Sequence, residues 1–492
     1  MSDPSHRLPT PGVEGLDPPR STGQEPSPLP RLARNTLTTR TVLASSMSNL
    51  APLMSFVFSF PVIVLGAGVG STFVLVVVAI AILFHCNTSV QFVKVVPSAG
   101  SYISYLGKTF GPIVAMITAV LVIPGYIAYL ASLLAVVGGW ASKIGTVYLG
   151  VHVPWQAVTV VCCLLIAYMV IAGIRISTQW LVALLAVQIF AILVGSVAVL
   201  VENARYLSFA AFDPLNVRNG FAGIGVGFPI AIWIFTGIGN AQGLAEDTKS
   251  PRTTIPRAIY MSFLIDVLLI LLMGWATTVG LHNSAAAMRH SSLPFISVTT
   301  AAFGVGILSF IIFLGTWIST AAEAVATTNT EARQWFSASR EGLLPRMFSP
   351  VGKRQTPWAS LTLHLSAALV VVLIWSIFDN RPFALFGYLA TVAGIPFVLM
   401  YIGINVALPI YYWGHERAVM SWFWHGLLPI LGVLVMLPPL VSAASPFQPS
   451  PYRYFPLAYG ALIVAAGAWA WQRSRRRPEL RHAAGSILAD RD

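Results

Sequence analysis

Apolar residues in this chain lie in long, nearly unbroken blocks, and polar residues gather in the short segments between them. Each block has about 20 residues, the length of helix that crosses about 30 Å of hydrocarbon. The pattern predicts an all-α polytopic membrane protein with about twelve transmembrane helices. The expected spans centre near Met54, Val76, Val122, Leu164, Ala191, Ile232, Leu269, Leu314, Val370, Phe397, Leu431 and Ile463.

Polar segments flank this membrane region at both ends. Residues 1–40 are rich in proline and contain no apolar run, so we expect a disordered N-terminal tail and no cleavable signal peptide. Residues 41–472 are expected to form the transmembrane domain. The basic segment 473–492 is expected to be a disordered C-terminal tail.

Composition and charge agree with a membrane protein. Of all residues, 56% are hydrophobic and only 9% are charged, against about 25% charged in an average soluble domain. With both termini in the cytoplasm, all but six of the 29 lysines and arginines fall on the cytoplasmic side, as the positive-inside rule requires. The net charge of +12 therefore reflects topology, and no nucleic-acid partner is expected. We expect a multi-pass protein of the cytoplasmic membrane.

Two of the expected spans are interrupted near their middle. The sixth contains Phe235-Thr236-Gly237-Ile238-Gly239-Asn240, and glycines weaken a helix at this depth. The first contains Ser45 to Pro52, and Pro52 is suited to begin a new helix that Ser48 or Asn49 would cap. Both breaks lie near the bilayer centre, roughly 16 Å from the surface for Pro52 at 1.5 Å per residue.

Paired breaks of this kind indicate a transport site. The helix that starts at each break presents unpaired N–H groups and the positive end of its dipole, which favour an anionic group such as a carboxylate. Corresponding interruptions in two halves of a chain are the best sequence indication of a transporter's central site. We therefore predict a secondary transporter with its site between the two breaks.

Three motifs, in the right order, resemble those of the amino acid–polyamine–organocation permeases. Pro97-Ser98-Ala99-Gly100-Ser101-Tyr102 is similar to the family's P-x-x-G-x-Y loop after span 2. Ala245-Glu246-Asp247 through Arg257-Ala258 resembles the acidic pair, N-P-R and I-P-R-A-I after span 6, with Ser250 in place of asparagine. Asn329 through Arg346, followed by Thr356-Pro357-Trp358, resembles the N-x-x-x-R and A-R-D-G-L-L-P segment after span 8.

The resemblance implies two inverted five-span repeats, spans 1–5 and 6–10, plus two trailing spans, in the fold of the leucine transporter. It implies alternating access and a substrate that is an amino acid or a related amine, moved by symport or exchange. By position, Phe235 would also gate the site. The resemblance places substrate binding at Pro52, Leu53, Met54, Ser55, Phe235, Thr236, Gly237 and Ile238.

The coupling ion is expected to be H⁺, or less favourably Na⁺, with no cofactor and no metal. Some proton-coupled relatives carry a lysine in span 5, where this chain has only Gln188 as a polar candidate. Two carboxylates are expected inside spans, Asp266 and Glu323, and an ionisable group in hydrocarbon indicates an ion or substrate path by default. Glu323, Asp266 and Gln188 are the coupling candidates.

Other functions stay open at this stage. The substrate can instead be a polyamine or another organic cation. A channel-like facilitator would need polar or charged rings along several spans, and a membrane enzyme would need clustered histidines and acids, and neither pattern is present. The expected partners are a small-molecule substrate and the lipid bilayer, and the sequence does not define an oligomeric state.

Overall fold

The computed structural model describes residues 32–304, 306–445, 448, 450–482 and 487–489. All regular structure within these residues is helical, which confirms the predicted all-α class. Most of the expected N-terminal tail, residues 1–31, lies outside the described part, as do 483–486 and 490–492 of the expected C-terminal tail. The described ends contact the helices: Leu37 forms an isolated parallel bridge with Thr248, and Leu480 and Leu488 are buried. The tail boundaries stay predictions.

Helices of very different lengths build the bundle. Several of them, such as α5 and α9 below, begin with proline, whose missing N–H and fixed φ suit the first helical position. The α-helices are α1 (Thr39–Leu50), α2 (Pro52–Ala67), α3 (Ser71–Val95), α4 (Tyr102–Phe110), α5 (Pro112–Leu149), α6 (Trp155–Ile171), α7 (Ile174–Glu202), α8 (Phe221–Ile234), α9 (Pro251–Gly280), α10 (Ala285–His290), α11 (Pro294–Phe303), α12 (Ile307–Arg340), α13 (Trp358–Phe378), α14 (Pro382–His415), α15 (Leu428–Ala444) and α16 (Phe455–Arg476).

Short turns connect these helices. Most are 3₁₀ turns, and η8 is a π-helical turn that leads into α15. They are η1 (Gly68–Gly70), η2 (Ala204–Tyr206), η3 (Ala210–Phe212), η4 (Pro214–Asn216), η5 (Asn240–Leu244), η6 (Arg346–Phe348), η7 (Arg417–Val419), η8 (Trp422–Leu427), η9 (Tyr452–Tyr454) and η10 (Pro478–His482).

Length and composition identify nine candidate membrane spans among the described residues. The first of these is a 57-residue run, Thr39–Val95, that contains both α1–α2 and α3. Two further apolar helices at expected spans fall below the length limit, because α6 has only 17 residues and α8 stops after 14. Dividing the first run and adding these two helices gives the twelve spans that the sequence predicts, and that count stays a prediction.

Both predicted helix breaks are present. α1 and α2 are separated by Ala51, whose φ of 44° and ψ of 61° are left-handed and cannot continue a helix. α8 ends at Ile234, and the chain turns through Gly237, at φ 97°, before η5. Glycine is needed there because a side chain strains this backbone conformation.

The expected cap of α2 is wrong. Its N-cap residue is Ala51, which makes no side-chain cap bond, because Ser48 and Asn49 belong to the last turn of α1. The Asn49 amide nitrogen instead donates to the Ser45 carbonyl at 3.0 Å. Its Oδ1 accepts from Thr327 Oγ1 at 3.1 Å, so Asn49 ties the break to α12.

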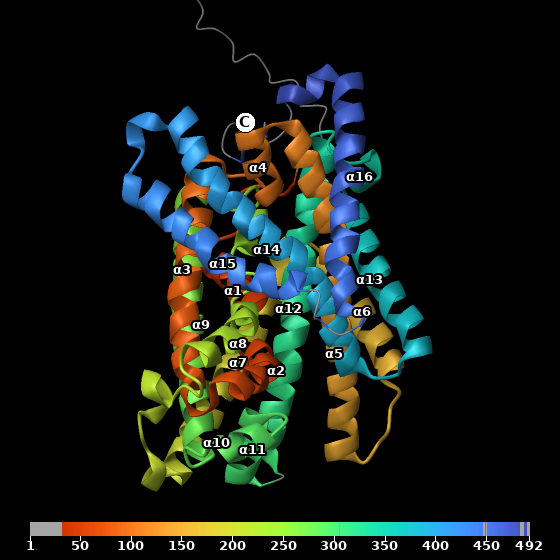
Figure 1. Cartoon of the computed structure of the whole chain (residues 1–492). Coiled ribbons are helices and arrows are strands. Elements are labelled where there is room, and N and C mark those ends of the chain that lie inside the picture. The colour runs from red at the N-terminus through yellow and green to blue at the C-terminus, as the bar shows by residue number, and fades with distance from the viewer. Residues whose placement is uncertain (1–31, 305, 446–447, 449, 483–486, 490–492) are drawn as a thin grey trace, which may run out of the picture.

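The two breaks meet in the middle of the bundle. A Cβ atom on Gly237 would lie only 2.7 Å from the Asn49 carbonyl oxygen, and Asn240 of η5 donates to Asn49 Oδ1 at 3.4 Å. Figure 1 shows α2 and α8 side by side, with α12 beside them, and α2 and α8 are in extensive contact. Packing thus brings together two breaks that lie nearly 190 residues apart in the sequence.

Segments that the predicted topology places on opposite sides of the membrane lie at opposite ends of the bundle (Figure 1). α4 and the C-terminal end of α16 lie at one end, whereas α10 and α11 lie at the other (Figure 1). The first end carries Lys108 and Arg473, expected in the cytoplasm, and the second carries Arg289, expected outside. The arrangement therefore agrees with the alternation of spans, while the orientation in a membrane stays a prediction.

Candidate substrate cavity and gate

A cavity of about 570 Å³ lies between α2, α5, α8, α12, α14 and α15. Its lining is mostly aromatic and aliphatic, with Phe58 on α2, Trp233 on α8, and Phe383 and Phe386 on α14. Apolar walls with a few placed polar groups are typical of small-molecule sites, whose volumes run from about 300 to 1,000 Å³. The size and the lining therefore suit a small organic ligand.

Two of the predicted substrate residues line this cavity, Met54 and Ser55 on the first turns of α2. Pro52 and Leu53 are buried next to them but do not line it. The N–H groups here are less free than the sequence indicates: Met54 N–H donates to Ser319 Oγ at 3.3 Å and Ser55 N–H to the Ala51 carbonyl at 2.9 Å.

The predicted substrate residues of the second break lie behind the cavity wall. Phe235 is 1% exposed and packs on Phe263, with ring centroids 5.8 Å apart, so it does not cover the cavity in this conformation. Thr236 and Ile238 are buried as well, and Gly237 N–H points to the Tyr401 hydroxyl at 3.5 Å. The reason is that α8 stops at Ile234 and the chain then turns toward α1.

Trp233, one residue before the end of α8, occupies the cavity wall instead. Its ring also packs edge-on against Phe397 at 6.5 Å. Sequence reasoning missed Trp233 because it placed the break, rather than the last helical turn before it, in the site. A large aromatic residue just before a glycine break was the available signal.

Glu323 on α12 is the only charged side chain among the described residues that line the cavity. It is 2% exposed, and the Tyr129 hydroxyl of α5 donates to its Oε1. Its Oε2 has no hydrogen-bond partner within the described chain. A buried carboxyl group with one open oxygen is available to a proton or to a cationic group of a ligand.

The other two coupling candidates lie away from the cavity. Asp266 on α9 is fully buried, and neither of its carboxyl oxygens has a hydrogen-bond partner among the described residues. Gln188 on α7 is likewise buried with an unpartnered side-chain amide. Neither lines the cavity, so the structure does not bring them together with Glu323.

Beside the two carboxylates expected inside spans, Asp266 and Glu323, α12 carries a further buried acid. α12 runs without interruption to Arg340, so it also carries Glu331, which is 0% exposed. The sequence did not reveal this residue because the apolar block of span 8 ends earlier than the helix does. Glu331 lies 3.5 Å from His364 on α13, measured between Oε2 and Nε2.

Ion pairs close the bundle at the end away from the cavity. Arg333 Nε donates to Asp247 Oδ2 at 2.8 Å, and both side chains are buried. Arg340 Nη1 donates to Glu246 Oε2 at 2.9 Å. At about 1.5 Å per residue, Arg333 lies roughly 15 Å along α12 from Glu323. Glu246 and Asp247 are the acidic pair of one sequence motif. Arg333 and Arg340 are basic residues of another motif, so the fold brings the two motifs into contact.

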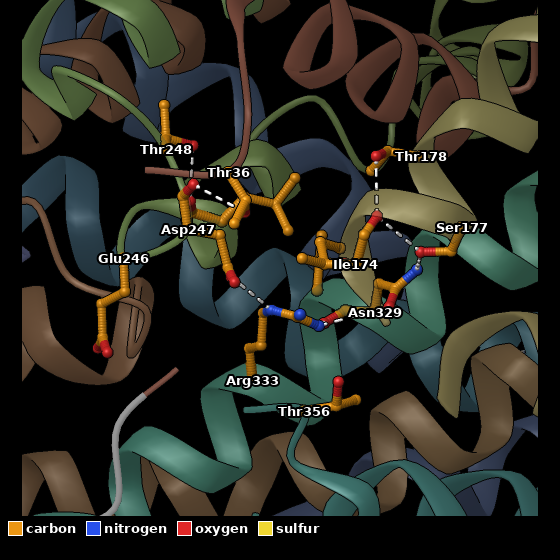
Figure 2. Close-up of polar contacts among 12 residues, drawn as sticks. Thr36, Ile174, Ser177, Thr178, Glu246, Asp247, Thr248, Asn329, Arg333 and Thr356 are labelled. Atoms are coloured by element: carbon orange, nitrogen blue, oxygen red, sulfur yellow. Dashed lines mark hydrogen bonds and ion pairs between the residues drawn. The ribbon is translucent and has the colours of Figure 1, made fainter. Parts of the chain in front are cut away.

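Polar contacts extend this closure to the N-terminal segment, as Figure 2 shows around Arg333, Asp247 and Asn329. Asn329 Nδ2 donates to Ser177 Oγ on α7 at 3.1 Å. Leu37 N–H donates to the Asp247 carbonyl at 2.9 Å, and Lys249 N–H to the Leu37 carbonyl at 3.1 Å. The segment before α1 is thus hydrogen-bonded to the backbone of the acidic pair. We call this group of contacts the closed gate, after the role that we propose for it.

An all-helical chain with two broken helices that meet beside an internal cavity has the architecture of a multi-pass membrane permease. The comparison with family models agrees, since the model described as amino acid permease matches residues 41–480. The chain belongs to this family of transporters, within the superfamily that its motifs resemble.

Three relatives illustrate the range of the family. The branched-chain amino acid permease BcaP of Bacillus subtilis is 24% identical over 60% of this chain and 65% of its own length, just under two thirds. BcaP of Lactococcus lactis is 25% identical over 75% of this chain and 81% of its own. The aspartate–proton symporter of Bacillus subtilis is 28% identical over 41% of this chain and 37% of its own.

Proposed function

We propose that this protein is a secondary transporter that moves a neutral amino acid with an apolar side chain across the cytoplasmic membrane by alternating access. The observation that carries the proposal is the cavity beside the two helix breaks, with apolar walls and a single acidic side chain. The branched-chain permeases among the relatives support the same substrate class. Both termini are proposed to lie in the cytoplasm, on the charge distribution alone.

The lining of the cavity supports this substrate class. Phe58, Trp233, Phe383 and Phe386 supply an apolar surface for the side chain. The ammonium group has one anionic partner, Glu323, while the start of α2 offers its dipole to the carboxylate. A large neutral side chain therefore fits better than an acidic one, which would add a second negative charge beside Glu323.

We propose that the described conformation is one of the two states of the transport cycle. The cavity lies on one side of the breaks, and the closed gate seals the other side. We propose that the alternate state forms when Arg333 separates from Asp247 and Arg340 from Glu246, so that the site opens at the gate. Such small rearrangements of a bistable interface are typical of transporters.

For the coupling ion we propose H⁺, carried by Glu323. Among the described residues of the lining no basic side chain is present to neutralise its charge, and its one partner, Tyr129, is a neutral donor. A proton or the substrate's ammonium group must therefore compensate the carboxylate when the cavity closes. Asp266, Gln188 and Na⁺ coupling are the alternatives that the same measurements test.

A second candidate substrate is an organic amine or polyamine. It is favoured by one observation, the absence of any basic side chain among the described lining residues, since a substrate carboxylate finds only the α2 terminus there. Such a substrate needs a cation-binding acid and no anion-binding group, and Glu323 meets that need.

The test is uptake by purified protein in liposomes, with labelled leucine, aspartate and putrescine at symmetric pH and with a pH gradient. We expect saturable leucine uptake that isoleucine and valine inhibit and that the pH gradient stimulates. Uptake of putrescine without leucine would establish the amine alternative. Non-saturable flux of all three would indicate a channel, and uptake of aspartate alone would overturn the role given to the apolar walls.

A further inference from the structure

Glu331 and His364 form a buried titratable pair that the proposed cycle does not yet use. Both side chains are 0% exposed, and they come from different helices, α12 and α13. Neither residue lines the cavity. Glu331 follows Glu323 by eight residues, or about 12 Å along the helix, toward the closed gate. The pair therefore lies between the cavity and the gate along α12.

Hydrogen-bond geometry fixes the protonation of the imidazole. His364 Nε2 lies 3.1 Å from the carbonyl oxygen of Tyr126, which can only accept, so Nε2 carries a proton. Nδ1 has no partner among the described residues. A doubly protonated ring would bury an unpaired N–H there, which is costly, so the neutral ring is favoured.

The carboxyl group of Glu331, unlike the imidazole, has no hydrogen bond that fixes its protonation state. Neither oxygen accepts a hydrogen bond within the described chain, and the imidazole N–H at 3.5 Å is already directed to the Tyr126 carbonyl. Arg333, two residues along α12, is bonded to Asp247 instead. An ionised Glu331 would be an uncompensated charge in the bundle, so the protonated form of the carboxyl is favoured in this conformation.

The remaining titratable groups that interact with Glu331 do not neutralise it. Tyr126 on α5 donates its hydroxyl to Gln334 Oε1 at 2.8 Å, and Tyr129, one turn along α5, donates to Glu323. Tyr401 on α14 and Glu323 on α12 are the other groups close enough to act on it electrostatically. These groups are phenols and another acid, so none of them supplies a positive charge.

We propose that Glu331, positioned by His364, is a second proton-binding site of the transport cycle, loaded while the gate is closed and emptied when the gate opens. The inference rests on the proposed function as a proton-coupled transporter. When Arg333 leaves Asp247, water reaches Glu331 from the gate side, and the carboxyl O–H bond breaks with transfer of H⁺ to that water. The carboxylate left behind is stabilised by the entering water and by the Nε2–H of His364, which turns from the Tyr126 carbonyl to the Glu331 oxygen 3.5 Å away. Glu323 then exchanges protons with the cavity side, and Glu331 exchanges protons with the gate side.

The first test compares Glu331→Gln with wild type in liposomes. Glutamine keeps the shape of a protonated glutamate, so we expect substrate exchange at symmetric pH to persist and stimulation by a pH gradient to be lost. Glu202→Gln is the matched control, because Glu202 is exposed at the end of α7, and it should behave as wild type. Full gradient stimulation in Glu331→Gln would overturn the proposal while leaving the proposed transport function intact.

His364→Phe tests the positioning role. It keeps an aromatic ring but removes the N–H that is best placed to stabilise the carboxylate, so Glu331 should hold its proton to higher pH and the pH profile of driven uptake should move upward. A loss of uptake at all pH values, with no shift, would assign His364 a structural role only and overturn its part in the proposal.

A spectroscopic test does not depend on transport. Infrared difference spectra of wild type minus Glu331→Gln at neutral pH should contain the carbonyl stretch of a protonated carboxyl group. Absence of that band would overturn the proposal even if the protein transports amino acids. If wild type transports none of the substrates tested, the proposed function fails, and the band still decides whether Glu331 holds a proton.

Discussion

The cavity and the closed gate use charge in opposite ways. Within the described residues, the cavity has a single acid, Glu323, with one oxygen left without a partner. In the gate, Asp247 faces Arg333 and Glu246 faces Arg340 in buried ion pairs. The unpartnered oxygen of Glu323 is available to a ligand or a proton. In the gate, by contrast, each acidic side chain forms an ion pair with an arginine. The proposed binding region therefore has an acid without a charged partner, whereas each acid of the proposed gate is paired with an arginine.

The largest effect is expected from Arg333→Ala, which leaves Asp247 buried without its cation. Removing one partner of a buried pair costs about 3–5 kcal/mol, so the gate should lose its closed state and the protein its stability. Thermal unfolding followed by fluorescence and uptake in liposomes would measure both. If uptake and unfolding temperature match wild type, the gate assignment is wrong.

An exposed pair provides the control for this variant. Arg381 donates to Asp379 at 2.8 Å between α13 and α14, and the Arg381 side chain is 74% exposed. Its hydrogen bonds hold the pKa of Asp379 below the ordinary value. Exposed pairs contribute little, so Arg381→Ala should unfold at the wild-type temperature.

Gly237→Ala should come next, with loss of most uptake and lowered stability. Its φ of 97° is strained for alanine by about 1–2 kcal/mol, and its Cβ would meet the Asn49 carbonyl at 2.7 Å. Gly225→Ala on α8 is the matched control, because open space surrounds that position. Wild-type uptake by Gly237→Ala would refute the need for close contact between the two breaks.

Glu323→Gln should lose only the response of uptake to a pH gradient. It keeps shape and hydrogen-bonding capacity but fixes the group in a neutral state, so we expect no uptake driven by a pH gradient and retained substrate exchange. Tyr129→Phe removes only the hydroxyl donor and should have a smaller effect of the same kind. Gradient-driven accumulation by Glu323→Gln would exclude it as the proton carrier and leave Glu331, Asp266, a sodium site or simple exchange.

The smallest effect on activity is expected from cysteine labels at Ser450 and Ser349, placed in a background without Cys86, Cys162 and Cys163. The predicted topology puts Ser450 outside, near the cavity end, and Ser349 inside, near the gate. An impermeant thiol reagent added to intact cells should modify the first and spare the second. The reverse labelling would invert the orientation of both regions.

The sequence by itself determined the class of fold and the positions of the breaks. Apolar blocks of membrane length require helices, because an unpaired backbone is too costly in hydrocarbon. Pro52 and Gly237 interrupt those helices for local reasons of backbone geometry and hydrogen bonding. Both properties depend on neighbouring residues only, so they could be predicted without a structure.

Tertiary structure alone decided which groups meet. Arg333 pairs with Asp247 across 86 residues, and Tyr129 reaches Glu323 across 194. Packing also put Trp233 rather than Phe235 on the cavity wall, and it buried Glu331 beside His364. Burial and ion pairing depend on which helix faces lie together in space, and the periodicity of a single segment does not contain that information.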